Sequence, residues 1–144
     1  MPTSASDPTR SSAEQVAAFC AALSAGRAAD AQVLLAPHVT WWVGGSVPGL
    51  SGTREGLEVC DLIENVLAAS TDGCLRFTPR SWTVQGSRVA LEALVEAELQ
   101  TGRQYRNEYH FAFTVEQQRI TSVRAYLDTE HLRETFAGQE PHTY

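Results

Sequence analysis

The chain has 144 residues, of which 43% are hydrophobic and 19% are charged, so it fits a single domain with its own core. Seventeen acidic against eleven basic residues give a net charge of −6, and no cluster of Lys or Arg occurs, which disfavours nucleic acid and anionic membranes as partners. No apolar run approaches the roughly eighteen residues that a membrane-spanning helix needs.

The first segment, MPTSASDPTRSS, is rich in Ser, Thr and Pro and lacks the basic-then-apolar order of a secretory signal. We therefore expect a disordered leader over residues 1–12, one domain over 13–137 and a polar tail over 138–144. Without an export signal, a cytoplasmic location is the expectation.

The next segments predict helices. Ser11 and Glu14 form the pattern of a capping box, which starts a helix that Gly26 ends. A second helix is expected over 27–37, where Pro37 ends it. A short strand over 38–45, HVTWWVGG, leads into the loop GGSVPGLSG, whose glycines and proline exclude regular structure. A third helix is expected over 53–70, with a buried stripe of Leu57, Cys60, Ile63, Val66 and Leu67.

The second half of the chain predicts strands over 75–85, 88–100, 103–116 and 119–128. The alternation of period two is clearest in NEYHFAFTVEQQRITSVRAYLDT, residues 107–129, which predicts a long hairpin. A short helix capped by Asp128 or Thr129 closes the pattern. Helices followed by an antiparallel meander predict an α+β domain, in which a curved sheet wraps around the helices and encloses a pocket.

The cysteines and histidines give little sign of a metal site. Cys20, Cys60 and Cys74 form neither a CxxC pair nor an even disulfide set, and we interpret them as buried thiols rather than metal ligands or nucleophiles. His131 and Glu134 form a helical pair without a third ligand of suitable spacing. We expect neither a metal nor a cofactor.

Two stretches, VTWWVGGSVPGLSGT and YRNEYHFAFTVEQQRITSVRAYLDT, resemble the SnoaL-like polyketide cyclases of the ketosteroid-isomerase and nuclear-transport-factor superfamily. The resemblance covers about Ala13 to Phe136. It implies a cone-shaped α+β fold with a closed apolar cavity, and a homodimer formed through the outer sheet face, where Arg124, Tyr126 and His110 form an amphipathic patch. Members include steroid isomerases, polyketide cyclases, epoxide hydrolases and non-catalytic binding modules, so the fold does not fix the reaction.

The resemblance also locates the catalytic acids of the enzymes. The general-base aspartate of the isomerases corresponds to Val43, and their second acid corresponds to Phe111. The aspartate of the cyclases and epoxide hydrolases corresponds to Ala125. None of the three positions carries an acid here, so a mechanism copied from those relatives lacks its carboxylate.

Glu92 is the carboxylate with two opposed interpretations. The family register points it into the cavity, where desolvation would favour its neutral form and let it act as an acid. The apolar alternation of Val89, Leu91, Ala93 and Val95 instead places Glu92 in water.

Other candidates lie on the aromatic face of the hairpin. Tyr109 and Asn107 could donate hydrogen bonds to a carbonyl, so they join Glu92 as candidate catalytic residues, although Tyr109 could equally pack with a satisfied hydroxyl. Trp41 and Trp82 could form a flat wall for a ligand or belong to the core. The expected substrate-binding residues are Trp41, Val43, Trp82, Leu94, Phe111, Phe113, Ala125 and Leu127.

Three hypotheses for the function follow. The first is a cofactor-independent cyclase or isomerase of secondary metabolism, such as antibiotic biosynthesis, that shapes a hydrophobic polyketide-type molecule for ring closure, including a cycloaddition. The second is a non-catalytic module for small-molecule binding or dimerisation. The third is an epoxide hydrolase or hydratase that uses Glu92 with a water.

Overall fold

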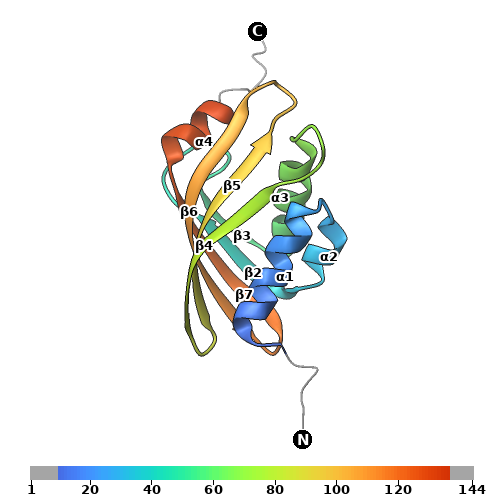
Figure 1. Ribbon diagram of the computed structural model, residues 1–144, viewed down its shortest axis with the longest axis vertical. Helices are drawn as coiled ribbons and strands as arrows, with labels where there is room; N and C mark the ends of the chain where they lie inside the picture. The colour runs from blue at the N-terminus through green and yellow to red at the C-terminus, as the bar shows by residue number, and fades with distance from the viewer. Residues whose placement is uncertain (1–9, 137–144) are drawn as a thin grey trace, which may run out of the picture.

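The computed structural model describes residues 10–136, so the predictions for residues 1–9 and for the tail 138–144 lie outside the described residues. The helices and strands follow one another along the chain as shown in Figure 1. The helices are α1 (Ser12–Ser24), α2 (Ala28–Gln32), α3 (Leu57–Ala68) and α4 (Thr129–Thr135), and the strands are β2 (Leu35–Val43), β3 (Gly52–Glu55), β4 (Arg76–Gln85), β5 (Arg88–Glu98), β6 (Gln104–Glu116) and β7 (Arg119–Leu127). No helix in this range is long and apolar enough to cross a membrane.

Helix α1 begins with the predicted capping box. The hydroxyl of Ser11 accepts the backbone N–H of Glu14 at 3.1 Å, and the Glu14 carboxylate accepts the backbone N–H of Ser11 at 2.9 Å. Residues 10–12, which we expected in the leader, take part in the fold: Arg10 and the Gln118 side chain exchange two hydrogen bonds of 2.9 Å. The capping box itself satisfies two backbone N–H groups at the start of the helix that have no partner within the helix.

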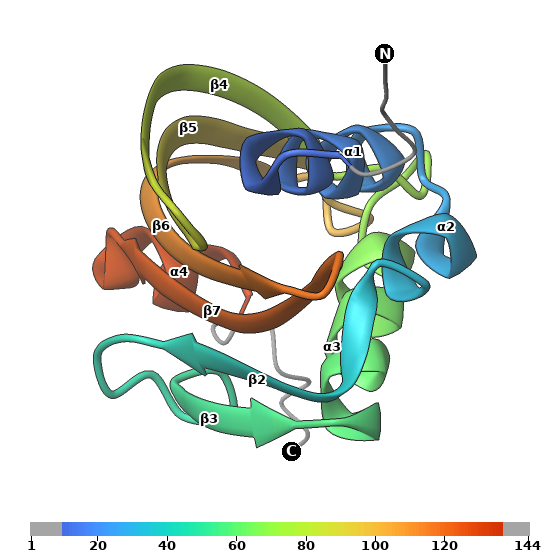
Figure 2. The same cartoon turned by 90° about the horizontal axis from the view of Figure 1, so that it is seen from below.

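The six strands form one sheet in the order β3-β2-β7-β6-β5-β4. Strands β4 to β7 pair as the predicted antiparallel meander, whereas β2 joins β7 in parallel, a pair that the sequence analysis did not anticipate. Figure 2 shows that the sheet is curved and that α1 and α3 lie on its concave side. The predicted α+β class with N-terminal helices and a curved sheet is confirmed.

Contrary to the prediction from the sequence, Pro37 does not end the second helix. Helix α2 stops at Gln32, and β2 already starts at Leu35, so Pro37 lies inside a strand. Proline cannot donate a ladder hydrogen bond, and it is tolerated at irregular positions. The β2–β7 register indeed shifts between Leu35 and Thr40, on either side of the proline.

The third helix also begins later than predicted. Residues 52–55 form the edge strand β3, which pairs with the end of β2, and Gly56 at φ 58° then turns the chain into α3. A residue with a Cβ would be strained at this φ. As the first residue of α3, Leu57 is 82% exposed rather than buried, and the buried positions are Val59, Ile63 and Leu67.

The core lies between the concave face of the sheet and the helices. Alternate residues of β5 are buried there, and an aromatic cluster joins three elements: the Phe19 ring centroid lies 6.0 Å from that of Trp41 and 6.3 Å from that of Phe113. Burying one such side chain contributes about 1.5–3 kcal/mol. Cys20 is buried here, and burial raises the pKa of its thiol to about 12. Cys60 and Cys74 are half-buried rather than buried, and all three thiols are free.

Candidate functional site

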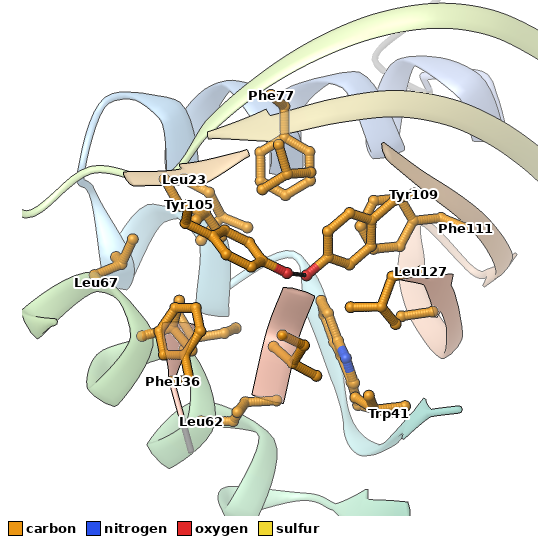
Figure 3. A pocket seen from close by; sticks show the side chains of 17 residues that line it. Leu23, Trp41, Leu62, Leu67, Phe77, Tyr105, Tyr109, Phe111, Leu127 and Phe136 are labelled. Atoms are coloured by element: carbon orange, nitrogen blue, oxygen red, sulfur yellow. Dashed lines mark hydrogen bonds between the residues drawn. The ribbon is translucent and has the colours of Figure 1, made fainter. Parts of the chain in front are cut away.

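An apolar cavity of about 90 Å³ lies between the concave face of the sheet and helices α1, α3 and α4. Figure 3 shows the 17 side chains that line it. None of these described residues is Asp, Glu, Lys, Arg or His, and the side-chain heteroatoms belong to Trp41, Tyr105 and Tyr109. The site therefore offers a ligand a hydrocarbon surface with a few fixed hydrogen-bonding groups.

Tyr105 and Tyr109 meet inside this cavity. Both project from the same face of β6, and their hydroxyl oxygens lie 2.6 Å apart (Figure 3). Each phenol has one proton and can both donate and accept. One of the two protons is used in the bond between the hydroxyls, so one O–H remains to donate to a ligand.

Asn107 lies between the two tyrosines on β6 and is 2% exposed. Its amide nitrogen donates to the Tyr105 hydroxyl at 3.1 Å and to the backbone carbonyl of Asp128 at 2.9 Å. Its amide oxygen accepts the backbone N–H of Asp128 at 3.0 Å. Because both amide N–H donors are occupied, Asn107 has none left for a ligand and instead orients Tyr105.

Burial sets the protonation state of the pair. Desolvation raises the pKa of Tyr105 to about 12, an effect that the hydrogen bonds from its neighbours only partly oppose. Burial, together with the neighbouring Tyr105, also raises the pKa of Tyr109 well above its ordinary value. Both phenols are neutral at physiological pH, so they serve as hydrogen-bond donors rather than as bases.

Helix α4 closes the cavity beside Tyr105. The His131 ring stacks on the Tyr105 ring with centroids 5.2 Å apart, and the Phe136 ring meets the Tyr105 ring edge-on at 4.9 Å. His131 Nε2 accepts the backbone N–H of Arg106 at 3.1 Å. Strand β7 pairs with β6 only from Tyr109 onward, so on that side α4 takes the place of a strand partner for the backbone N–H of Arg106.

The start of α4 agrees with the sequence prediction. The Asp128 carboxylate accepts the backbone N–H groups of Glu130 and His131 at 3.0 and 3.2 Å, which makes it the expected N-cap rather than a base. Among residues 10–136 no group of three or more His, Cys, Asp or Glu side chains could hold a metal ion.

Several predicted site residues line the cavity. They come from three strands: Trp41, Val43, Tyr109, Phe111, Ala125 and Leu127. Three of these, Val43, Phe111 and Ala125, are the positions that the family resemblance equates with catalytic acids. All three line the cavity and all three are apolar, so the positions that the resemblance equates with carboxylates carry none in this chain.

Glu92 does not face the cavity. It lies on the outer face of β5 with its side chain 59% exposed, 3.9 Å from the Nδ1 atom of His110. The apolar alternation therefore predicted its direction correctly, and the family register did not. The physical reason is the strand period: the neighbours Leu91 and Ala93 are both 0% exposed and occupy the concave side.

Three other predicted contacts also lie away from the cavity. Trp82 is 37% exposed on β4, the edge strand, beyond a register irregularity between Pro79 and Ser81. Leu94 is buried but stands opposite Glu108 in the register, on the outer face. Phe113 is buried in the aromatic core, outside the cavity lining.

Tyr105, the hydrogen-bonding partner of Tyr109, is not among the site residues predicted from the sequence. The sequence pattern does indicate this position, because the alternation that places Tyr109 and Asn107 on one face extends back two residues to Tyr105. The helix residues that complete the cavity, such as Leu62 of α3 and Phe136 after α4, gave no such signal, since their contact depends on helix docking.

Comparisons with known proteins agree with this fold. The model of the SnoaL-like domain matches residues 16–123. Among solved structures, an NTF2-like protein from Burkholderia xenovorans LB400 is 24% identical, with a TM-score of 0.68 over 85% of this chain and 93% of that one. TerC, co-crystallised with polyporic acid, is 21% identical, with a TM-score of 0.74 over 85% and 95% of the chains. A putative isomerase from Bacillus subtilis is 19% identical, with a TM-score of 0.73 over 88% and 93%.

No curated protein sequence matches the chain significantly. The solved structures share less than a quarter of its residues and therefore bear on the fold alone. The domain model matches well over half of the chain, including the strands that carry the tyrosine pair and its aromatic surroundings. The chain belongs to the family of SnoaL-like domains, and its fold is that of the NTF2-like proteins.

Proposed function

We propose that the cavity binds a hydrophobic small molecule with a carbonyl group, of polyketide type, and converts it by isomerisation or ring closure without a cofactor. The observation that carries the proposal is the pair of neutral phenols, Tyr105 and Tyr109, with one donor left in an otherwise apolar site. A donor fixed in a dry cavity favours an oxygen that gains negative charge during the reaction. A carbonyl on the substrate would accept it.

The lining offers no carboxylate or imidazole to remove a proton, so the reaction class that suits it best needs no base. In an intramolecular cycloaddition two carbon–carbon bonds form from the π electrons of the substrate, and no proton or leaving group departs. Holding a flexible chain in the reactive conformation can contribute about 7–11 kcal/mol in favourable cases. A hydrogen bond from the tyrosine pair to a conjugated carbonyl would withdraw electron density and lower the barrier further.

Two of the structural comparisons are consistent with this proposal, one in its ligand and the other in its reaction class. TerC was crystallised with polyporic acid, and another fold relative carries the description of a putative isomerase. The cavity wall of Trp41, Tyr109 and Phe111 provides flat surfaces that suit an aromatic or polyene ligand.

A non-catalytic binding module is the second candidate, because the three family acid positions are apolar in this chain. Such a module would use the same cavity and the same donor, but it would release its ligand unchanged. We do not propose an epoxide hydrolase, because Glu92, the carboxylate that this hypothesis requires, points away from the cavity.

Turnover of linear polyenyl ketones by purified protein tests the proposal. We expect a product with the mass of the substrate and without its polyene absorbance. Losing one neutral hydrogen bond costs about 0.5–1.5 kcal/mol, so Tyr109→Phe and Tyr105→Phe should each slow the reaction by about two- to tenfold. Stoichiometric binding without product would favour the module, and rates equal to that of the parent protein in both variants would contradict the role of the hydroxyls.

A further inference from the structure

The cavity is small for the ligands that the proposed function requires. Its volume is about 90 Å³. For comparison, an engineered cavity of about 150 Å³ in another protein binds benzene. A bicyclic or polyene ketone is larger than benzene, so one side chain of the lining has to move before such a ligand fits.

Phe77 is the side chain best placed to move. It is half-buried at the top of the cavity in Figure 3, where its ring centroid lies 5.7 Å from that of Phe111. The same side chain also lines an open groove of about 430 Å³ between α1 and β4. Phe77 is therefore a wall shared between the cavity and the more open groove on the outside.

The groove has room for the ring because its α1 wall is made of short side chains. Ala17 and Ala21 of α1 and the C-cap residue Ala25 follow one another at intervals of one turn and are exposed. The backbone of β4 is fixed beside them, since Phe77 donates its N–H to the Ser24 hydroxyl at 2.9 Å and Leu75 donates to the Leu23 carbonyl at 3.1 Å. Because these bonds hold the backbone, we expect movement here in the Phe77 side chain rather than in the strand.

We infer that Phe77 is a gate that sets the size of ligand the site accepts. In the closed position its ring completes the cavity wall. In the open position the ring lies in the groove against α1, and the space that it leaves joins the cavity. This inference rests on the proposed function for the size of the ligand, but the movement of the ring can be measured without any ligand.

The first experiment observes the ring directly. 4-Fluorophenylalanine is incorporated and the ¹⁹F resonance of Phe77 is assigned from the spectrum of Phe77→Leu. We expect relaxation dispersion from exchange between two positions in the free protein, on the microsecond to millisecond scale typical of gating motions. Ala21→Leu should suppress this exchange by filling the groove. Ala18→Leu, at a half-buried position of the same helix outside the groove lining, is the control for a larger side chain on α1.

The second experiment measures the Kd of 1-tetralone, a bicyclic ketone, and of tetralin, its hydrocarbon counterpart. Overpacking by Ala21→Leu should weaken binding of both about tenfold by blocking the open position. In a Phe77→Ala background the same substitution should change the Kd less than twofold, because no ring needs the groove. Ala21 is exposed, so its replacement leaves the core intact, and melting curves check the fold of Phe77→Ala.

The two ideas fail in different ways. If tetralone and tetralin bind equally, the donor role of the tyrosine pair is wrong. The gate is still supported in that case if Ala21→Leu weakens the binding of both ligands. The gate would be overturned if the Phe77 resonance shows no exchange and if neither Ala21→Leu nor added tetralin changes that resonance. Additive effects of Ala21→Leu and Phe77→Ala on the Kd would overturn it as well.

Discussion

The hydroxyl oxygens of Tyr105 and Tyr109 lie 2.6 Å apart. Asn107, between them on β6, donates a hydrogen bond to the Tyr105 hydroxyl and also binds both the backbone carbonyl and the backbone N–H of Asp128. One buried amide thus orients the donor pair and anchors the start of α4. Helix α4 in turn supplies Leu132, part of the cavity wall. Site geometry and helix docking therefore depend on the same residue.

Replacing Asn107 by Leu should lower the free energy of unfolding by about 2–4 kcal/mol, because an apolar side chain leaves the backbone N–H and carbonyl of Asp128 without these partners and removes one hydrogen bond from the Tyr105 hydroxyl. Urea denaturation measures the change. Asn65→Leu, on the exposed side of α3, is the control and should stay within about 0.5 kcal/mol of the parent. A loss for Asn107→Leu no greater than that of the control would contradict the anchoring role.

Stability should decline at alkaline pH. Burial raises the pKa of both Cys20 and Tyr105 to about 12, whereas in the unfolded chain a thiol ionises near pH 8.5 and a phenol near pH 10. The unfolded state loses these protons first, so the stabilisation is complete below the unfolded pKa values and is lost as pH rises toward the folded values. Each group contributes a slope of about 1.4 kcal/mol per pH unit while only its unfolded form is ionised.

Urea denaturation from about pH 8 to about pH 11 checks this window. Cys20→Ala should remove the decline that begins at the lower pH, and Tyr105→Phe should remove part of the decline above pH 10. A free energy of unfolding that stays constant over the whole range would show that these groups are not held neutral by the fold.

Glu92→Gln should leave turnover within about twofold of the parent, because its side chain points away from the cavity. Trp41→Ala and Phe111→Ala should reduce kcat more strongly, since they enlarge the site and loosen the bound conformer. Trp41→Phe is a milder variant that keeps an aromatic wall. Steady-state kinetics after confirmation of unchanged melting measure the effect, and a large loss confined to Glu92→Gln would restore acid–base catalysis.

We predict that the chain forms a homodimer through the outer face of the sheet. Trp42 and Tyr126 pack there with ring centroids 5.0 Å apart, and the Arg124 guanidinium lies 4.0 Å from the centroid of the Trp42 ring. Tyr126 is 43% exposed, and exposed aromatic and Arg side chains are enriched in interfaces. Sedimentation at micromolar concentration should show a dimer that Tyr126→Glu dissociates, and a monomer for the parent chain would contradict the prediction.

The sequence by itself determined much of the local structure. Strands β4 to β7 begin and end within a few residues of their predicted bounds, because alternation and hairpin-sized turns act between near neighbours. The same local rule predicted the outward direction of Glu92. Caps such as Ser11 and Asp128 were equally readable, since a side chain satisfies N–H groups only two or three residues away.

Tertiary structure decided what depends on distant segments. Strand β2 continues through Pro37 because it adds in parallel to β7, which lies more than eighty residues along the chain, and β3 exists only as its edge partner. The cavity likewise required the docking of α3 and α4, which brings Leu62 and Phe136 into the same cavity lining as Tyr105. Local periodicity fixes which face a residue occupies, but contacts between faces are set by packing of the whole chain, and no short window of sequence contains that information.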